Sequence, residues 1–416
     1  MFFKTFFSHL VIFSHTQHIN AFIINIILSQ FKNLYYLRIY MAGIYIHIPF
    51  CRTRCIYCDF HSGTDMSVQD RYIDALCNEL DLRISELKDT PIHTLYIGGG
   101  TPSQLSPSAL RRLFDHLSKY ITWTNCSEVT IECNPDDLSD DYITHLRTLP
   151  INRISMGIQS FDDKDLHFLR RRHSAQAALD AIRRCQTAGY DNISIDLIYG
   201  LPQQSLEAWD KNIDIALSTG VQHISAYALI YEEGTSLMKL KEQGLVEECN
   251  DELSLAMYAR LIERLETAGY LQYEISNFAL PHREAQHNSS YWNDTHYLGL
   301  GAAAHSYDGV TRRYNPTNTR AYIESIEQSQ CCYDEEILTD SDLYNDMLLT
   351  RLRTRQGIDE TKVATQFNST YINYMYRMAQ PHLACGNMEQ NNGFLRITRQ
   401  GLFISDSIIS DLFMVE

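Results

Sequence analysis

Residues 45–60 read Tyr-Ile-His-Ile-Pro-Phe-Cys-Arg-Thr-Arg-Cys-Ile-Tyr-Cys-Asp-Phe, a strand-like apolar run followed by a short segment with three cysteines. The pattern places the thiols of Cys51, Cys55 and Cys58 on the loop that leaves the first strand. Spacings of four and three residues let one loop wrap a cuboidal [4Fe–4S] cluster, with each thiolate bound to a different iron. Three thiolates leave one iron open to a further ligand, so this loop predicts an iron–sulfur site.

Zinc is the main alternative metal for this loop. A closed zinc site needs four ligands, and only His61 stands at ligand spacing as a fourth. Three incidental cysteines are the other alternative, but thiols so close together in a reducing compartment usually bind metal or act in catalysis.

The chain beyond this loop alternates short apolar runs with segments of helical periodicity, the pattern of βα units around a parallel sheet. The predicted strands are residues 44–48, 93–97, 128–132, 153–157, 192–197 and 223–229. The predicted helices are residues 68–87, 109–120, 140–146, 175–188 and 206–217. These elements predict an α/β fold, a partial (β/α)6 barrel with its site at the C-terminal ends of the strands.

The pattern changes after residues 231–234. Long helices are expected at 251–268 and 341–352, and a small hairpin and helix at 393–398 and from 401 onward. We therefore predict a barrel domain over residues 41–235 and a mostly helical C-terminal domain over residues 236–416.

The first forty residues differ in composition from the rest, with many Phe, Ile and Asn and almost no acidic residues. Their longest apolar stretch, residues 21–28, is broken by Asn25, whereas a membrane-spanning helix needs about 20 predominantly apolar residues. The segment that follows it, Ser-Gln-Phe-Lys at residues 29–32, is a poor match to the small-residue cleavage site of a signal peptide. We predict that residues 1–40 are an extension outside the fold, and that Met41 is the true start.

Charge and cysteine content limit the possible functions. The 416 residues include 35 basic and 51 acidic side chains, a net charge of −16 that argues against a nucleic-acid partner. The eleven cysteines are an odd number spread over a long chain, unlike a disulfide framework. A reduced, cytoplasmic protein is the expected setting.

Polar residues and glycines close several predicted strands. Residues 98–102, Gly-Gly-Gly-Thr-Pro, end the second strand in a backbone that a ligand can approach closely. Glu132 ends the third strand, where a carboxylate can hold the two hydroxyls of a ribose. Gln159 and Asp196 end the fourth and fifth strands, and a polar residue there is costly unless it faces a site.

The Cys-x3-Cys-x2-Cys motif, followed by an aromatic residue, resembles the signature of the radical S-adenosylmethionine (SAM) superfamily. Residues 45–51 narrow the resemblance to the branch of oxygen-independent coproporphyrinogen III oxidases and heme chaperones, over about residues 43–309. The resemblance implies a radical-SAM barrel and a [4Fe–4S] cluster whose open iron is chelated by the amino and carboxylate groups of SAM. In that superfamily an electron from the cluster cleaves SAM to a 5′-deoxyadenosyl radical.

The same resemblance implies which residues contact SAM. Arg171 lies in a run of three arginines that would otherwise be a solvated basic patch, and its guanidinium can pair with a carboxylate. Tyr45 and Tyr57 flank the cluster motif, although aromatic residues there could equally be ordinary packing. Whether one or two SAM molecules bind stays open. The implied contacts are Tyr45, Tyr57, Gly99, Gly100, Thr101, Glu132, Gln159, Arg171 and Asp196.

Residues 287–292, His-Asn-Ser-Ser-Tyr-Trp, form the last motif. On a helix, His287 and Tyr291 share one face, with Trp292 beside them, and provide a nitrogen ligand and aromatic walls for a flat macrocycle. From spacing alone, a packing role is favoured over heme. The motif is similar to the heme-binding signature of the heme chaperones, which implies heme binding by His287, Asn288, Tyr291 and Trp292.

Two differences separate the chain from the oxidases. Phe60 stands where the oxidases carry a further cysteine, and residues 1–40 contain no proline and so lack the substrate-covering motif. The favoured function is a heme chaperone that passes heme to an acceptor. The alternative function is that of an oxygen-independent coproporphyrinogen III oxidase, and a third hypothesis is a non-catalytic scaffold held together by zinc. Whether the chain is an enzyme therefore stays open. The implied partners are heme, an unidentified acceptor protein, an electron donor such as flavodoxin or ferredoxin, and a transiently bound membrane.

Overall fold

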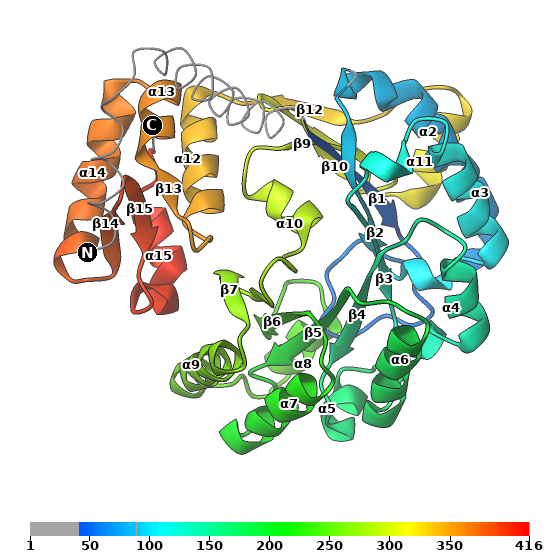
Figure 1. Cartoon of the computed structure of the whole chain (residues 1–416), viewed down its shortest axis with the longest axis horizontal. Coiled ribbons are helices and arrows are strands. Elements are labelled where there is room, and N and C mark those ends of the chain that lie inside the picture. The colour runs from blue at the N-terminus through cyan, green and yellow to red at the C-terminus, as the bar shows by residue number, and fades with distance from the viewer. Residues whose placement is uncertain (1–40, 89, 416) are drawn as a thin grey trace, which may run out of the picture. The chain divides into compact units, whose positions relative to one another are not determined.

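The computed structural model describes residues 41–88 and 90–415, and the predictions made for residues 1–40 lie outside them. A parallel sheet of six consecutive strands forms the centre of the fold (Figure 1). Each strand lies within two residues of its predicted ends, so the α/β prediction is confirmed. The strands are β1 Ala42–Ile48, β2 Ile92–Gly99, β3 Glu128–Cys133, β4 Arg153–Gln159, β5 Ile193–Tyr199 and β6 His223–Ala228.

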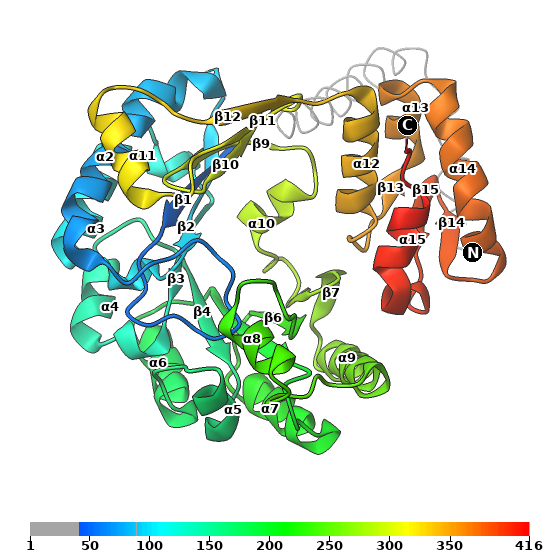
Figure 2. The ribbon, with the colours of Figure 1, turned by 180° about the vertical axis from the view of Figure 1, so that it is seen from behind.

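Amphipathic helices cover the outer side of this sheet, whereas α10 (Gln286–Tyr291) lies on the inner side (Figures 1 and 2). The outer helices are α2 Gln69–Arg83, α3 Pro107–Leu117, α4 Asp140–Leu146, α5 Asp163–Phe168, α6 Ala175–Thr187 and α7 Leu206–Ser218. Serine side chains cap four of them by accepting a backbone N–H of the first turn: Ser106, Ser139, Ser174 and Ser205. The buried faces of the helices and the strands share one apolar core.

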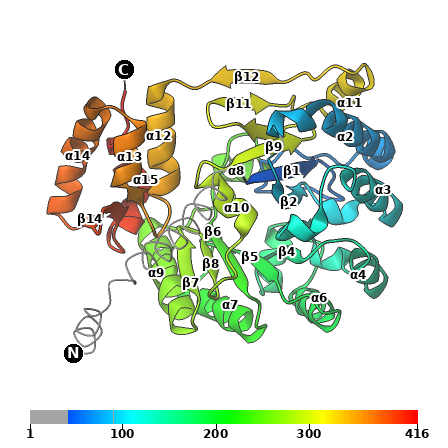
Figure 3. The same cartoon turned by 45° about the horizontal axis from the view of Figure 1, so that its top comes forward.

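The sheet does not end at residue 235, where we predicted the first domain to end. Strand β9 (His296–Leu300) pairs in parallel with β1, and three further strands follow it at that edge (Figure 3). At the other edge, β8 (Asn277–Ala279) pairs with β6, and β7 (Leu271–Glu274) pairs with β8. These strands are short and several are polar, so they lack the apolar runs by which the central strands are recognised. The remaining elements of this part are α8 Ser236–Glu242, α9 Asp251–Thr267, β10 His305–Tyr307, β11 Thr311–Tyr314, α11 Thr319–Glu327 and β12 Asp334–Ile337.

The chain from residue 340 onward forms a separate apolar core of its own, with Tyr344, Leu348, Met375, Ile408 and Leu412 at its centre. Its elements are α12 Asp340–Arg351, β13 Ile358–Asp359, α13 Glu360–Gln366, α14 Ser369–Ala384, β14 Met388–Asn391, β15 Phe394–Ile397 and α15 Ser405–Asp411. A hairpin and a following helix are present, as predicted, but the hairpin starts earlier than residue 393: β15 lies in the predicted range, and its partner β14 precedes it. Within residues 41–88 and 90–415, no helix combines the length and apolar character needed to cross a membrane.

A buried ion pair joins α2 to the sheet extension. Arg83 Nη1 lies 2.8 Å from Glu79 Oε1, and each side chain is only 2% exposed. Arg83 also donates to the carbonyl of Gly299, while Glu79 accepts from the backbone N–H of Gly301 and from the hydroxyl of Tyr322. The pair therefore holds the end of β9 and helix α11 against α2.

We predict that Glu79→Ala lowers the free energy of unfolding by about 3 kcal/mol, because the buried Arg83 keeps only Glu86 as an ionic partner and the Gly301 N–H and Tyr322 hydroxyl lose their acceptor. The exposed pair of Arg71 and Glu327 joins the same two helices, so Glu327→Ala is the control and should leave stability almost unchanged. Urea unfolding followed by circular dichroism measures both. Equal losses in the two variants would contradict the role given to the buried pair.

Candidate functional site

A cavity of about 800 Å³ opens at the C-terminal ends of the parallel strands and extends along the inner face of the sheet. Fifteen of the sixteen predicted site residues line it, and His287 is the exception. Those fifteen are Tyr45, Cys51, Cys55, Tyr57, Cys58, Gly99, Gly100, Thr101, Glu132, Gln159, Arg171, Asp196, Asn288, Tyr291 and Trp292. The cysteine loop and the end of α10, far apart in sequence, thus face one space.

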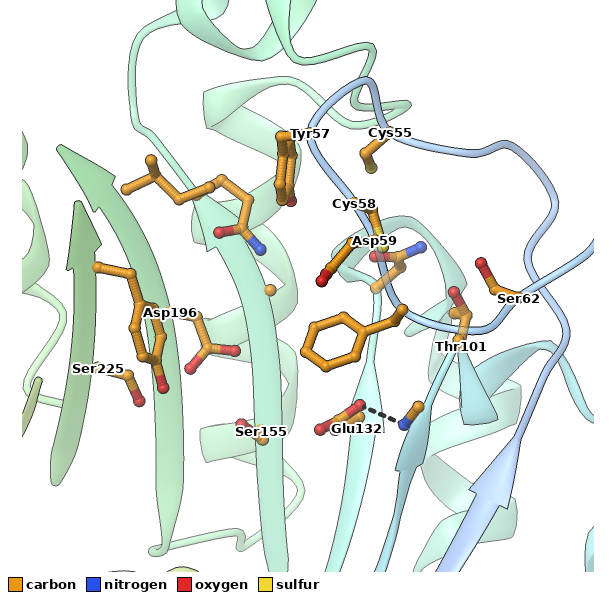
Figure 4. Close-up of a pocket in the computed structure, with 18 of the residues that line it drawn as sticks. Cys55, Tyr57, Cys58, Asp59, Ser62, Thr101, Glu132, Ser155, Asp196 and Ser225 are labelled. Carbon is orange, nitrogen blue, oxygen red and sulfur yellow. Dashed lines mark hydrogen bonds between the residues drawn. The ribbon is translucent and has the colours of Figure 1, made fainter. Parts of the chain in front are cut away.

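The cysteine loop is closed by backbone hydrogen bonds at its base. The N–H of Cys51 donates to the carbonyl of Gly63, and the N–H of Gly63 donates to that of Pro49. Cys51 Sγ lies 3.4 Å from Thr101 Oγ1. Figure 4 shows Cys58 at the edge of the cavity, above Glu132.

The donor set of this loop fits an iron–sulfur cluster. Among the described residues, no three His, Cys, Asp or Glu side chains converge on a single metal ion. Thiolates that hold a cluster each bind a different iron, so they need not converge on one point. Burial raises the pKa of the Cys58 thiol to about 11, so its deprotonation requires the free energy of metal binding.

Arg171 lies beside the cysteines. Its Nη1 donates to Cys55 Sγ at 3.4 Å, and its Nη2 donates to Asn134 Oδ1 at 2.6 Å and to the carbonyl of Gly157. Arg171 Nε is buried without a partner among the described residues. The guanidinium therefore adds positive charge next to the thiols and has a free donor.

Glycines at the end of β2 let that strand approach the cysteine loop. Gly99 has φ +107°, and a Cβ on it would lie 2.6 Å from the His47 ring. A Cβ on Gly100 would lie 2.8 Å from the carbonyl oxygen of Ile48, which accepts the Gly100 N–H at the same distance. We expected these glycines to bring the backbone close to a ligand, and in the structure their closest neighbours belong to β1 and the segment after it.

Two carboxyl groups face the cavity from neighbouring parts of the sheet (Figure 4). Glu132 accepts from the hydroxyl of Tyr96 at 2.7 Å and from the N–H of Gly99 at 3.1 Å. Burial raises the pKa of Glu132 to about 7 and that of Asp196 to about 6. Both groups can accept hydrogen bonds from ligand hydroxyls, and near neutral pH neither is fully charged.

Gln159 is held in a strained conformation at the end of β4. Its φ is +72°, in the left-handed region that non-glycine residues rarely occupy, and the register of β4 against β5 shifts there. Such strain persists only where the surrounding structure enforces it, and it often marks functional sites.

His287 lies behind the cavity wall and is 1% exposed. Its Nδ1 is hydrogen-bonded to Thr94 Oγ1 at 2.8 Å and its Nε2 to Tyr291 Oη at 2.9 Å. Burial lowers the pKa of this imidazole to about 3, so the ring is neutral. Both nitrogens are engaged in this conformation, and iron ligation by His287 stays a prediction that requires one of these bonds to break.

The inner face of the sheet contributes cavity residues that the sequence analysis missed. Every second residue of β4 lines the cavity: Arg153, Ser155, Gly157 and Gln159. Of these four residues, only Gln159 stands at the C-terminal end of its strand, the position from which site residues were predicted. Polar side chains at a period of two within an apolar strand are the signal that identifies Arg153 and Ser155. The other missed lining residues include Asp59, Tyr96, Asn134, Ser194, Ser225, Glu274, Asn277 and Arg353.

Comparisons with known proteins agree with this architecture. Residues 45–216 match the family model of the radical SAM superfamily, and residues 338–404 match that of the HemN C-terminal domain. The chain is 33% identical to the heme chaperone HemW of Bacillus subtilis over 372 residues, which cover 88% of this chain and 98% of that protein. The chain belongs to the HemW family of radical SAM proteins. The resemblance seen in the cysteine motif is thereby confirmed.

Other members of the HemW family and a solved structure extend the comparison. The heme chaperone HemW of Lactococcus lactis is 35% identical over 330 residues, 79% of this chain and 85% of that protein. The coproporphyrinogen III oxidase HemN of Escherichia coli, a radical SAM enzyme, aligns with a TM-score of 0.79 at 21% identity and covers 91% of this chain and 93% of its own. The likeness to HemN shows a shared fold.

The raised pKa of Glu132 predicts a pH-dependent stability. The folded pKa of about 7 exceeds the ordinary value of 4.5, so the buried carboxyl destabilises the fold increasingly as pH rises from 4.5 through 7. Glu132→Gln should therefore gain on the order of 2 kcal/mol relative to wild type between pH 5 and pH 8. Urea unfolding of protein without added SAM measures this difference, with the exposed Glu247→Gln as control. A difference that is constant with pH would contradict the buried, raised carboxyl.

Proposed function

We propose that this protein binds heme and delivers it to an acceptor protein, and that the same cavity holds a [4Fe–4S] cluster and SAM. The observation that carries the proposal is that the cysteine loop and the aromatic end of α10 line one cavity. The names of the relatives from Bacillus subtilis and Lactococcus lactis support heme as the cargo. An acceptor protein and an electron donor such as flavodoxin or ferredoxin are the partners this function requires.

Cys51, Cys55 and Cys58 would hold the cluster, which supplies an open iron site and a source of single electrons. The residues that would hold SAM surround that loop. Glu132 can accept hydrogen bonds from ribose hydroxyls, because it lies at the strand end with its carboxyl group facing the cavity. Arg171, with its free Nε donor beside Cys55, can pair with the carboxylate of an amino acid.

The heme-binding wall would be formed by Tyr291 and Trp292. Tyr291 is held by its hydrogen bond to His287 and by edge-to-face contact with Tyr297, with ring centroids 4.9 Å apart. Arg353 lies over the Trp292 ring, 5.2 Å from its centroid. An aromatic wall of fixed orientation suits a flat macrocycle, and in this conformation His287 contributes by orienting Tyr291.

The cysteine loop is tested by single substitutions after anaerobic reconstitution. Serine in place of Cys55 should abolish the broad visible iron–sulfur absorbance, because one iron loses its thiolate. Cys385 is exposed at the end of α14, away from the cysteine loop, so Cys385→Ser is the matched control and should keep the full iron–sulfur absorbance. Retention of four irons per chain in Cys55→Ser would contradict the assignment.

The heme function is tested by loading the reconstituted protein with hemin and adding apomyoglobin as the recipient. We expect stoichiometric heme binding and transfer, with no conversion of coproporphyrinogen III in the presence of SAM and a reductant. Conversion at enzymatic rates would favour the alternative, an oxidase. Phe60, which is 65% exposed at the cavity, stands where the oxidases carry a cysteine.

His287 could act by orienting Tyr291 or by ligating the heme iron, and the position of the Soret band in wild type and in His287→Ala distinguishes these two roles. If His287 orients Tyr291, His287→Ala should weaken heme binding several-fold and leave the Soret maximum of the bound heme unchanged. Thr94→Val removes only one of the two hydrogen bonds and should have a smaller effect. A shifted Soret maximum in His287→Ala alone would establish ligation and contradict the orienting role.

A further inference from the structure

Arg153 is a buried cation on the inner face of the sheet. It is the first residue of β4, it is 1% exposed, and it lines the cavity. Its Nε and Nη1 have no hydrogen-bond partner among the described residues. A guanidinium is charged at all physiological pH values, and a buried charge without a partner is strongly destabilising. This side chain therefore lacks the anion that its burial requires.

The surrounding groups do not supply that anion. The ionisable groups near enough to interact with the charge of Arg153 include Glu132, Asp196, Tyr96, His223, Tyr273 and His287. The histidines and the tyrosines are neutral at neutral pH because burial disfavours their charged forms. Glu132 and Asp196 lie near enough to feel the charge of Arg153, but neither accepts a hydrogen bond from its Nε or Nη1, so these two donors stay without a partner among the described residues.

A second arginine in the same cavity provides a contrast. Arg353 Nη2 lies within ion-pair distance of Glu274 Oε2, at 3.7 Å, so this arginine has a carboxylate beside it, although its Nε has no hydrogen-bond partner among the described residues. Next to it, the indole Nε1 of Trp292 is a buried donor with no partner in the described part of the chain. The residues of β4 and of the end of α10 that line the cavity thus include a cation without a hydrogen-bonded anion, Arg153, and an aromatic ring with an unpaired N–H donor, Trp292.

We propose that Arg153 binds a carboxylate of the cargo, a propionate group of the tetrapyrrole, while the macrocycle packs on Trp292. The proposal rests on heme as the cargo, as inferred above. Guanidinium groups bind carboxylates through their N–H donors, and Nε and Nη1 of Arg153, which lie on different edges of the group, are each free to donate a hydrogen bond.

The position of Arg153 along β4 indicates which of two candidate carboxylates it binds, a propionate of the tetrapyrrole or the carboxylate of SAM. Arg153 begins β4 and Gln159 ends it, about 20 Å apart along the strand. The cysteine loop lies at the end of the sheet where Gln159 is. A SAM molecule with its amino-acid end at the cluster cannot place the same carboxylate at the start of β4, so the anion at Arg153 belongs to another molecule.

The test compares hemin with hemin dimethyl ester, in which both propionates are masked. Wild-type protein should bind hemin at least about tenfold more tightly than the ester, the size expected of a charged hydrogen bond. Arg153→Gln should lower hemin affinity to that of the ester and leave ester affinity unchanged. Arg153→Lys keeps the charge and should retain part of the preference, and it serves if the Gln variant fails to fold. Arg260→Gln on α9 is the control and should match wild type.

Equal affinity of wild type for hemin and its ester would overturn the proposal. So would a fall in SAM affinity in Arg153→Gln with hemin binding unchanged, because the carboxylate would then be that of SAM. A wild-type protein that binds neither porphyrin would refute heme as the cargo. In that case, glutarate serves as a simple dicarboxylate probe in a thermal-shift measurement. If glutarate stabilises the wild type but not Arg153→Gln, Arg153 binds a carboxylate. If glutarate stabilises neither protein, the carboxylate site is refuted.

Discussion

The two faces of the parallel sheet carry opposite chemistry, and the site depends on that contrast. The outer face is apolar and packs on helices, whereas the inner face places Arg153, Ser155, Glu132 and Asp196 around a cavity of about 800 Å³. Charged and polar groups buried on a sheet are costly unless they have partners. Glu132 finds partners in Tyr96 and Gly99, but the free donors of Arg153 do not, so the fold retains polar groups that only a ligand completes.

The cysteine loop and the aromatic end of α10 line one cavity, although more than 200 residues separate them in the sequence. The cysteine loop follows β1, and α10 precedes β9, the strand that pairs with β1 on its other side. Because β9 pairs in parallel with β1, α10 lies beside the start of β1, whereas the cysteine loop leaves its end, so the two flank opposite ends of the cavity along the inner face of the sheet. A cluster and a macrocycle would then occupy different ends of one cavity, with the inner face of the sheet between them.

The central strands and most helices could be predicted because their apolar runs and capping serines are strong local signals. The strands after residue 235 could not be predicted, because β7 to β12 are short, several are polar, and they gain their order by pairing at the sheet edges. The strand-end residues of the site were found, since a polar residue stands out after an apolar run. Arg153 was missed because it opens its strand, and the burial of His287 could not be predicted because Thr94, its partner, is 193 residues away.

The most direct test of a shared cavity is a crystal structure of the anaerobically reconstituted protein with hemin bound. We predict the macrocycle against Trp292, with a propionate at Arg153, in the same cavity as a cluster held by Cys51, Cys55 and Cys58. A heme located on the outer face of the sheet or on the C-terminal helices would contradict the account.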